Sequence, residues 1–468
     1  MATKRFRIEK DSLGEVKVPK GALWGAQTQR AVNNFPISGI KMDFPFTKSF
    51  VSSLGVIKDA AAKANLRLKL LPAKKARAIS KAAKEVWQEK HHKEFPIDVF
   101  QTGSGTSSNM NANEVIANLA TKYAKTKISA NDDVNMSQSS NDVIPTAIKV
   151  SASMDLTKKL YPALDKLIDE IEKKAKSVEG VVKTGRTHLM DAMPVDLSDE
   201  LRAWTGQLSA SRKMLDVIQQ RLLQLPQGGT AVGSGINAHK QFAKYFAQEM
   251  TKLSGGKDKF VPSENFFHEL SAQDCSVQLS GELKNLAVVL MKISNDLRWM
   301  NSGPLAGLSE IELQALQPGS SIMPGKVNPV IPEAVTMASA DVIGNDVTIT
   351  VAAQAGNFQL NVMLPVIAYN LLKSINLLAG AMNVLSSKAI KTFKVNKKNL
   401  EASLAMNPIL VTALNPIIGY AKAAEIAKKA YKEGRPIIDV ALEETDLSRS
   451  RLTKLLDPAK LTKGGISK

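Results

Sequence analysis

Apolar residues recur every three or four positions over much of the chain, which is the spacing of one face of an α-helix. Between residues 148 and 177 the other positions hold mainly Lys and Asp, and this pattern predicts a long amphipathic helix. The same period returns in three further segments, Leu201–Leu222, Val277–Leu297 and Ala334–Leu385. Breaks rich in Gly or Pro occur at 226–237 and 303–329. Long helices separated by such breaks are typical of a helical bundle.

The two ends of the chain have a different pattern. Short alternating segments, Phe6–Glu9 and Val16–Pro19, predict small strands and turns near the N-terminus. A segment rich in Lys and Asn, Lys391–Asn399, precedes a smaller C-terminal helical region. Aromatic residues make up only 5% of the 468 residues, and the apolar residues are chiefly Ala, Leu, Ile, Val and Met. We therefore expect an all-α protein of two or three domains.

The net charge of +18 is compatible with nucleic acid, an acidic surface or an anionic substrate as the partner. The lysines are scattered along the predicted helices, form no long basic block and do not alternate with aromatic residues. This distribution favours a solvated basic face over nucleic-acid binding.

Cysteine content and apolar run lengths indicate the compartment. The single cysteine, Cys275, excludes an intrachain disulfide and favours a reducing environment. The first residues contain no apolar core of a secretory signal. The densest apolar stretches, such as Leu286–Met291, are far shorter than the ~20 residues of a membrane-spanning helix. We expect a soluble, cytoplasmic protein that binds neither membrane nor nucleic acid.

Four polar islands interrupt the apolar period: Thr102–Glu114, Ser137–Thr146, Thr184–Pro194 and Gly319–Glu333. Each island alone is typical of a surface loop or a helix cap. Together they predict one polar pocket. The last island carries hydroxyls, an ammonium and an amide between Gly319 and Gly325, which we interpret as hinge points of a mobile loop. Lysine and amide donors suit a small dicarboxylate, and the alternative is a loop whose lysine faces solvent.

The stretch Gly-Ser-Ser-Ile-Met-Pro-Gly-Lys-Val-Asn at 319–328 resembles the defining block of the fumarase/aspartase superfamily. Other blocks of this superfamily follow in the same order along nearly the whole chain: Trp24–Arg30, Thr102–Glu114, Ser137–Asp142, Gly185–Leu189, Gly356–Asn361 and Thr412–Gly419. Three variable positions separate the members. Ser104, Ser140 and His188 are similar to class II fumarases, whereas aspartases typically have Ala, Thr and Gln there.

The resemblance implies a mainly helical chain of three domains: an N-terminal mixed, mostly helical domain at 1–139, a central long-helix bundle at 140–396 and a small helical domain at 397–468. It further implies a homotetramer with a shared helical core, in which three subunits build each active site. The reaction would be the reversible hydration of fumarate to L-malate, a step of the tricarboxylic acid cycle, without metal or other cofactor. The sequence contains neither a His-x-x-x-His pair nor a carboxylate cluster at metal-ligand spacing.

Residue roles also follow from the resemblance. Ser320 would be the base, His188 would activate the water, and Glu333 would orient His188. Lys326 and Asn328 would hold the carboxylate on which negative charge accumulates. Further hydrogen bonds to the substrate would come from the following residues: Ser104, Gly105, Thr106, Ser139, Ser140, Asn141, Thr187 and Ser321.

The chain departs from the family pattern at several positions. Some fumarases have a second dicarboxylate site, for which Ser129, Asn131 and Asp132 are the candidates here, but the Arg and His of that site are missing. Met190 and Leu305 also replace the usual Gln and Arg. The alternatives to fumarate hydratase are an aspartate ammonia-lyase, a non-catalytic structural member like the lens crystallins, and a basic nucleic-acid binder, whose affinity would fall steeply with salt.

Overall fold

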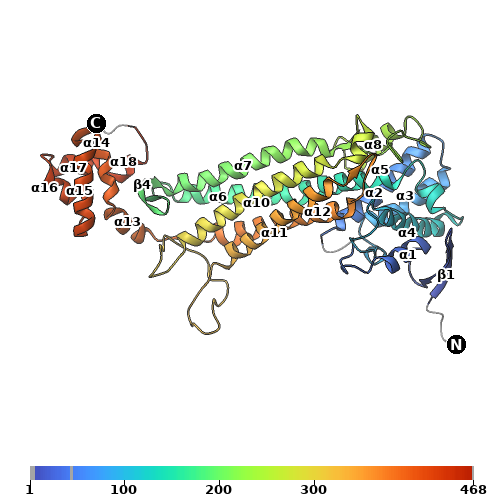
Figure 1. Cartoon of the computed structure of the whole chain (residues 1–468), viewed down its shortest axis with the longest axis horizontal. Coiled ribbons are helices and arrows are strands. Elements are labelled where there is room, and N and C mark those ends of the chain that lie inside the picture. The colour runs from blue at the N-terminus through green and yellow to red at the C-terminus, as the bar shows by residue number, and fades with distance from the viewer. Residues whose placement is uncertain (1–5, 43–45, 466–468) are drawn as a thin grey trace. The chain divides into compact units, whose positions relative to one another are not determined.

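A computed structural model describes residues 6–42 and 46–465. The fold is mainly helical, as predicted (Figure 1), and its contacts divide it into two units. Unit 1 comprises Met1–Pro162, Ser211–Ala287 and Ala338–Ala379, and unit 2 comprises Ala163–Ala210, Val288–Met337 and Gly380–Lys468. The prediction that the chain starts without a signal segment concerns, in part, residues 1–5, which lie outside the described residues.

Unit 1 starts with a hairpin in which β1 (Phe6–Asp11) pairs with β2 (Gly14–Pro19) in antiparallel fashion. These are the strands that the alternating segments predict. The helices and short strands that follow, apart from those shared with unit 2, are α1 (Ala26–Asn34), α2 (Lys48–Arg67), α3 (Ala73–Trp87), η1 (His92–Glu94), α4 (Thr106–Ala124), η2 (Ala130–Val134), α5 (Ser140–Asp155), η3 (Leu156–Leu160), β5 (Gln224–Leu225), α8 (Phe242–Leu253), β6 (Val261–Pro262), α9 (Phe266–Ser271), β8 (Gly356–Asn357) and β9 (Leu360–Asn361).

Helix α2 lies at the centre of unit 1 and contacts α3, α4, α5 and α8. Phe50, Leu54 and Ile57 on this helix are almost completely buried. Gly55 allows a close approach, because a Cβ atom at this position would lie 2.8 Å from the backbone nitrogen of Trp87 on α3. A dense core therefore supports the starts of α4 and α5, where two of the polar islands lie.

Each of five long helices has residues in both units: α6 (Tyr161–Ser177), α7 (Leu197–Leu222), α10 (Asp274–Met300), α11 (Val330–Ala353) and α12 (Leu364–Leu385). They occupy the segments with the helical period. The predicted continuous helix at 148–177 is instead α5, a π-helical turn η3 and α6. Pro162 explains the interruption, because it has no N–H to donate to the preceding turn. The predicted block Ala334–Leu385 is two helices, α11 and α12, with the β8–β9 hairpin between them.

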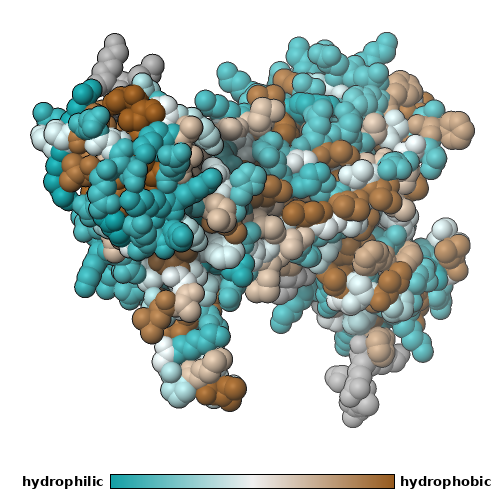
Figure 2. All heavy atoms as spheres, turned by 60° about the vertical axis from the view of Figure 1, so that its left-hand side comes forward, coloured by the Kyte–Doolittle hydropathy of each residue, from teal (hydrophilic) through white to brown (hydrophobic). Residues whose placement is uncertain are grey.

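Figure 2 shows that many apolar side chains remain on the face of the molecule that it displays. Exposed apolar residues in unit 1 include Val347 and Val351, which lie one turn apart on α11. They line a largely apolar groove of about 570 Å³ together with Phe35, Val99, Phe100 and residues of the β9–α12 region.

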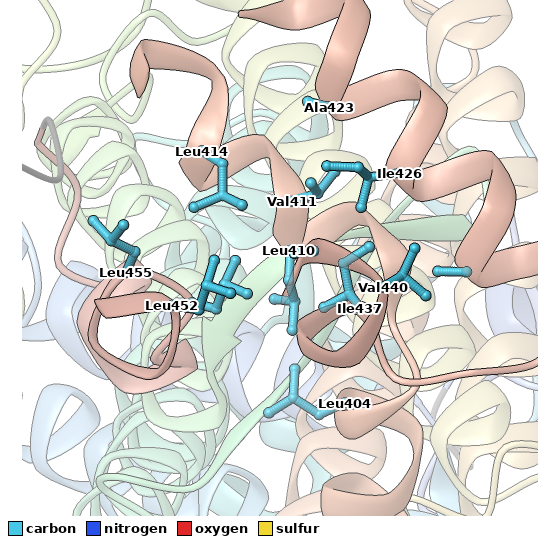
Figure 3. Packing of buried hydrophobic residues seen from close by; sticks show 13 residues of the cluster. Leu404, Leu410, Val411, Leu414, Ala423, Ile426, Ile437, Val440, Leu452 and Leu455 are labelled. Atoms are coloured by element: carbon cyan, nitrogen blue, oxygen red, sulfur yellow. The ribbon is translucent and has the colours of Figure 1, made fainter. Parts of the chain in front are cut away.

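Unit 2 contains a hairpin of β3 (Val182–Thr187) and β4 (Met190–Asp196), and a short pair of β7 (Ile311–Glu312) with β10 (Lys394–Val395). The C-terminal region is helical, as predicted: η4 (Ser386–Ile390), α13 (Lys397–Ala405), η5 (Pro408–Leu414), α14 (Asn415–Ile418), α15 (Tyr420–Glu433), α16 (Ile437–Glu444), α17 (Arg449–Leu455) and α18 (Pro458–Leu461). Figure 3 shows its core, in which Leu410, Leu414, Ile426 and Val440 point toward one another.

The lengths of the uninterrupted apolar stretches did not indicate one long apolar helical segment. The helical segment Leu364–Ile390 is long and apolar enough, by length and composition, to cross a membrane. Its apolar residues are separated by Lys373, Lys388 and several uncharged polar residues, so the sequence shows no long uninterrupted run. Most of this segment is buried inside the protein, which is the pattern of a core helix.

Candidate active site

Helix α4 begins at the first polar island. Gly105 is the residue before its first turn and has a φ of +72°, a left-handed conformation that favours glycine. A Cβ atom here would lie 2.9 Å from the side chain of Ile144 on α5, so the start of α4 packs closely against α5. The hydroxyls of Ser104 and Thr106 lie 2.7 Å apart. The chain thus places three predicted binding residues at one helix N-terminus.

Helix α5 begins at the second island with a reciprocal cap. The Ser139 hydroxyl accepts from the backbone N–H of Asn141 at 3.2 Å, and the Asp142 carboxylate accepts from the N–H of Ser139 at 2.9 Å. Burial raises the pKa of Asp142 to about 6, although backbone donors such as Gly228 N–H oppose this shift.

The two N-termini are adjacent, because Asn109 on α4 donates to the hydroxyl of Ser140 at 2.9 Å. Ser139, Ser140 and Asn141 are half-buried. Helix N-termini carry a positive partial charge and free N–H groups, so this region of unit 1 is suited to bind an anion.

His188 lies in unit 2, in the two-residue turn between β3 and β4, where Thr187 pairs with Met190. His188 has a φ of +56° and Leu189 has a φ of +62°. Two positive φ values define the type I′ turn, which normally contains Asn or Gly. The turn therefore holds an exposed histidine in a strained backbone, which is a feature found at functional sites.

A buried ionic cluster supports this hairpin. Glu310 accepts from Lys183 at 2.5 Å and from Arg186 at 2.6 Å, and Lys183 also contacts Glu200 at 2.9 Å. The side chains of Lys183 and Glu310 are almost fully buried. The strand pairing is irregular between Thr184 and Arg186, and such bulges redirect side chains. The cluster fixes the hairpin to the segment that leads into the Ser320 loop.

The Ser320 loop closes on itself. Gly319 donates its N–H to the carbonyl of Lys326 at 2.7 Å, and the Asn328 amide donates to the carbonyl of Gly319 at 2.8 Å. Inside the closed loop, the N–H groups of Ile322 and Met323 donate to the Ser320 hydroxyl oxygen at 3.2 Å and 3.0 Å. These two donors stabilise negative charge on that oxygen.

Lys326, Asn328 and Glu333 line a cavity of about 540 Å³ in unit 2, together with Arg298 and Asn301. Glu333 lies in the first turn of α11. Within the described part of the chain, no hydrogen bond or ion pair joins Glu333 to His188. The predicted site residues thus divide between the units, with the starts of α4 and α5 in unit 1 and the β3–β4 turn and the Ser320 loop in unit 2.

Two other predictions concern ligand sites. Ser129 and Asp132 bond to each other at the start of η2, with the Ser129 hydroxyl donating to the carboxylate at 2.7 Å, and Asn131 is exposed beside them. The second dicarboxylate site at these residues stays a prediction. Across residues 6–42 and 46–465, no three His, Cys, Asp or Glu side chains are grouped as metal ligands.

Sequence reasoning missed several residues that support the site. Glu114, at the end of the first island, accepts from the backbone N–H groups of Gly25, Gln27 and Thr28 and so caps α1. This cap links the sequence block at Trp24–Arg30 to the block at Thr102–Glu114. Lys58 and Glu310 are almost fully buried charged residues outside the islands. The sequence could have indicated Lys58, because this lysine lies among the buried alanines of α2.

Comparisons with known proteins agree with this architecture. A family model described as "Lyase" matches residues 14–344, and one described as "Fumarase C C-terminus" matches residues 410–463. The helical fold and its polar loops are therefore those of a lyase. The chain is 59% identical over 460 residues to fumarate hydratase class II 2 of Pseudomonas aeruginosa, covering 98% of this chain and 99% of that protein. It is 46% identical to the Bacillus subtilis class II enzyme, covering 98% and 99%.

A solved structure gives the same result. The class II fumarase of Schistosoma mansoni superposes with a TM-score of 0.94 at 36% identity, covering 98% of this chain and 99% of that one. The chain belongs to the class II fumarate hydratase family, whose members are hydro-lyases. The family predicted from the sequence blocks is confirmed.

Proposed function

We propose that the protein catalyses the reversible hydration of fumarate to L-malate, with Ser320 as the base that removes the C3 proton of malate. The observation that supports this role best is the pair of N–H groups, from Ile322 and Met323, that point at the Ser320 oxygen. Hydrogen bonds to the charged form of a group lower its pKa. A serine in this loop is therefore suited to act as an alkoxide.

The remaining roles follow the flow of charge. Removal of the C3 proton sends an electron pair into the neighbouring carboxylate, which becomes an aci-carboxylate with an additional negative charge. Lys326 and Asn328 stabilise this carboxylate. His188 then protonates the departing C2 hydroxyl, which leaves as water, and in the reverse direction it activates that water. Glu333 orients His188, and Ser104, Thr106 and Ser139–Asn141 bind the other carboxylate.

We further propose a cytoplasmic homotetramer in which three chains build each site, acting in the tricarboxylic acid cycle. No hydrogen bond or ion pair joins His188 to Glu333 among the described residues, and a neighbouring chain would bring such a pair together. The apolar groove at Val347 and Val351 is suited to be covered by another copy. The three-domain division at 139 and 396 remains a prediction.

Replacement of Ser320 tests the proposal. Ser320→Ala should lower kcat for L-malate dehydration by at least about 10³-fold, which is within the range for loss of a base. The tetramer and the KM should remain nearly unchanged. Ser387→Ala, at a half-buried serine whose hydroxyl donates to the backbone of its own helical segment, is the matched control. A fully active Ser320→Ala tetramer would place the base elsewhere.

A further inference from the structure

A fully buried lysine lies beneath the starts of α4 and α5. The Lys58 ammonium on α2 donates to the side-chain oxygens of Asn135 and Gln138, each at 2.9 Å. No carboxylate lies within ion-pair distance of it among the described residues. Burial lowers the pKa of Lys58 to about 7, and the charge of Asp142 partly opposes this shift. An ammonium held by neutral acceptors alone is costly to bury, so its retention calls for a role.

Lysine fixes the direction of the hydrogen bonds around it, because an ammonium donates and never accepts. The side-chain oxygen of Asn135 must therefore face Lys58. The same oxygen also accepts from the amide nitrogen of Asn109, at 3.2 Å. The second hydrogen of that nitrogen is donated to the Ser140 hydroxyl oxygen at 2.9 Å. Ser140 is thus an acceptor toward the protein interior, and its own hydrogen is left to donate outward.

The outward side of Ser140 is the anion-binding region of unit 1. Ser140 is the first residue of α5, and Asn109 follows Thr106 by one turn of α4. A hydroxyl that donates from this position suits a carboxylate, which accepts hydrogen bonds only. A hydroxyl turned the other way would present lone pairs to the anion and repel it.

We propose that Lys58 is a positioning residue of the dicarboxylate site, which through Asn135 and Asn109 holds Ser140 as a hydrogen-bond donor to a substrate carboxylate. The inference rests on the proposed function. It assigns to Lys58 no contact with the substrate. Loss of the Lys58 proton removes the positive charge and gives the nitrogen a lone pair, so the bonds to Asn135 and Gln138 weaken and the direction of the chain of hydrogen bonds is held less firmly.

The charged groups around Lys58 define how it responds to pH. The carboxylate of Asp142 attracts the Lys58 charge, and it accepts hydrogen bonds from the N–H groups of Gly228 and Thr230 at 2.9 Å each. Asp133 on η2 is paired with Lys75 at 2.8 Å, and Asp59 on α2 is paired with Lys63 at 3.0 Å. The charge of Lys58 is therefore balanced chiefly by Asp142.

Steady-state kinetics of the tetramer test the inference with the variants Lys58→Met, Ser140→Ala and their combination. Lys58→Met should raise the KM for L-malate roughly tenfold, the size expected for a lost charge-assisted bond, with kcat within about twofold of wild type. Ser140→Ala should have a similar effect, and the double variant should be no worse than Ser140→Ala alone. Lys58→Arg, which also donates only, should restore part of the affinity.

The pH dependence of wild type gives an independent readout if Lys58→Met fails to form a tetramer. The KM of wild type should rise as the pH increases above about 7, where Lys58 loses its proton. The KM of Lys58→Met, or of Lys58→Arg if only that variant folds, should not follow this titration. Additive effects in the double variant, or an unchanged KM in a folded Lys58→Met tetramer, would overturn the inference. A wild type that does not turn over L-malate would instead refute the proposed function.

Discussion

The backbone N–H of Met323 points at the hydroxyl oxygen of Ser320 from 3.0 Å, and the N–H of Ile322 joins it from 3.2 Å. This arrangement depends on closure of the loop between Gly319 and Lys326. The proposed base and the N–H groups that would stabilise its charge therefore come from a few consecutive residues of one chain.

Gly319 is essential to that closure, because a Cβ atom on it would lie 2.5 Å from the Lys326 carbonyl oxygen. We expect Gly319→Ala to lower kcat about 10²-fold or more, comparable to losing an oxyanion donor. Gly21→Ala, at an open position with no close neighbour, should leave kcat unchanged. Equal activity of both variants would show that loop closure is not required.

The strained turn at His188 makes a second prediction. Leu189→Gly relieves a left-handed conformation that costs a side chain about 1–2 kcal/mol, and the greater freedom of unfolded glycine offsets part of this gain. We expect a small increase in the free energy of unfolding and a severalfold lower kcat, because His188 is held less firmly. Leu189→Ala retains the strain and serves as the control. Denaturant titration and malate kinetics measure the two effects.

Breaking the buried cluster beneath this turn should be costly. Glu310→Gln leaves Lys183 and Arg186 without their shared carboxylate, and loss of one member of a buried ion pair typically costs about 3–5 kcal/mol. The exposed pair Glu170–Lys173 offers a matched control, since Glu170→Gln should cost less than about 1 kcal/mol. Urea unfolding of both variants at one protein concentration makes the comparison. A Glu310→Gln tetramer as stable as wild type would contradict it.

The periodicity of apolar residues was sufficient to predict the long helices, the N-terminal hairpin and the small helical C-terminal region. It could not predict the π-helical turn before Pro162 or the hairpin that separates α11 from α12, because both depend on local backbone bonding. The sequence blocks indicated Ser320 and His188 as site residues. They did not indicate Lys58 or Glu310, whose importance comes from burial and from partners distant in the sequence.

The buried Lys58 also predicts how stability depends on pH. Its ordinary pKa of 10.5 falls to about 7 in the folded chain, so the folded state binds fewer protons than the unfolded state between these values. The contribution of Lys58 to the free energy of unfolding therefore increases as the pH rises from about 7 toward 10. The difference between wild type and Lys58→Met should grow in favour of wild type over that range. Denaturant titrations at several pH values measure it, and a constant difference would contradict the assignment.

The apolar groove of unit 1 predicts where copies of the chain associate. Val347 and Val351 are exposed and lie one turn apart on α11. We expect the double variant Val347→Glu, Val351→Glu to shift the proposed tetramer to smaller species and to lose activity with it, because charges are poorly tolerated in the core of an interface. Sedimentation velocity combined with malate kinetics tests this. Exposed Tyr431 on α15 provides a control position.

Substrate choice is the most direct test of the account. His188, Ser104 and Ser140 distinguish this chain from aspartases, and the comparisons place it among class II fumarate hydratases. The formation of fumarate should be measured from its ultraviolet absorbance, once with L-malate and once with L-aspartate as the substrate, under the same conditions. We predict rapid formation from L-malate and none from L-aspartate. Fumarate formed from L-aspartate but not from L-malate would contradict the account.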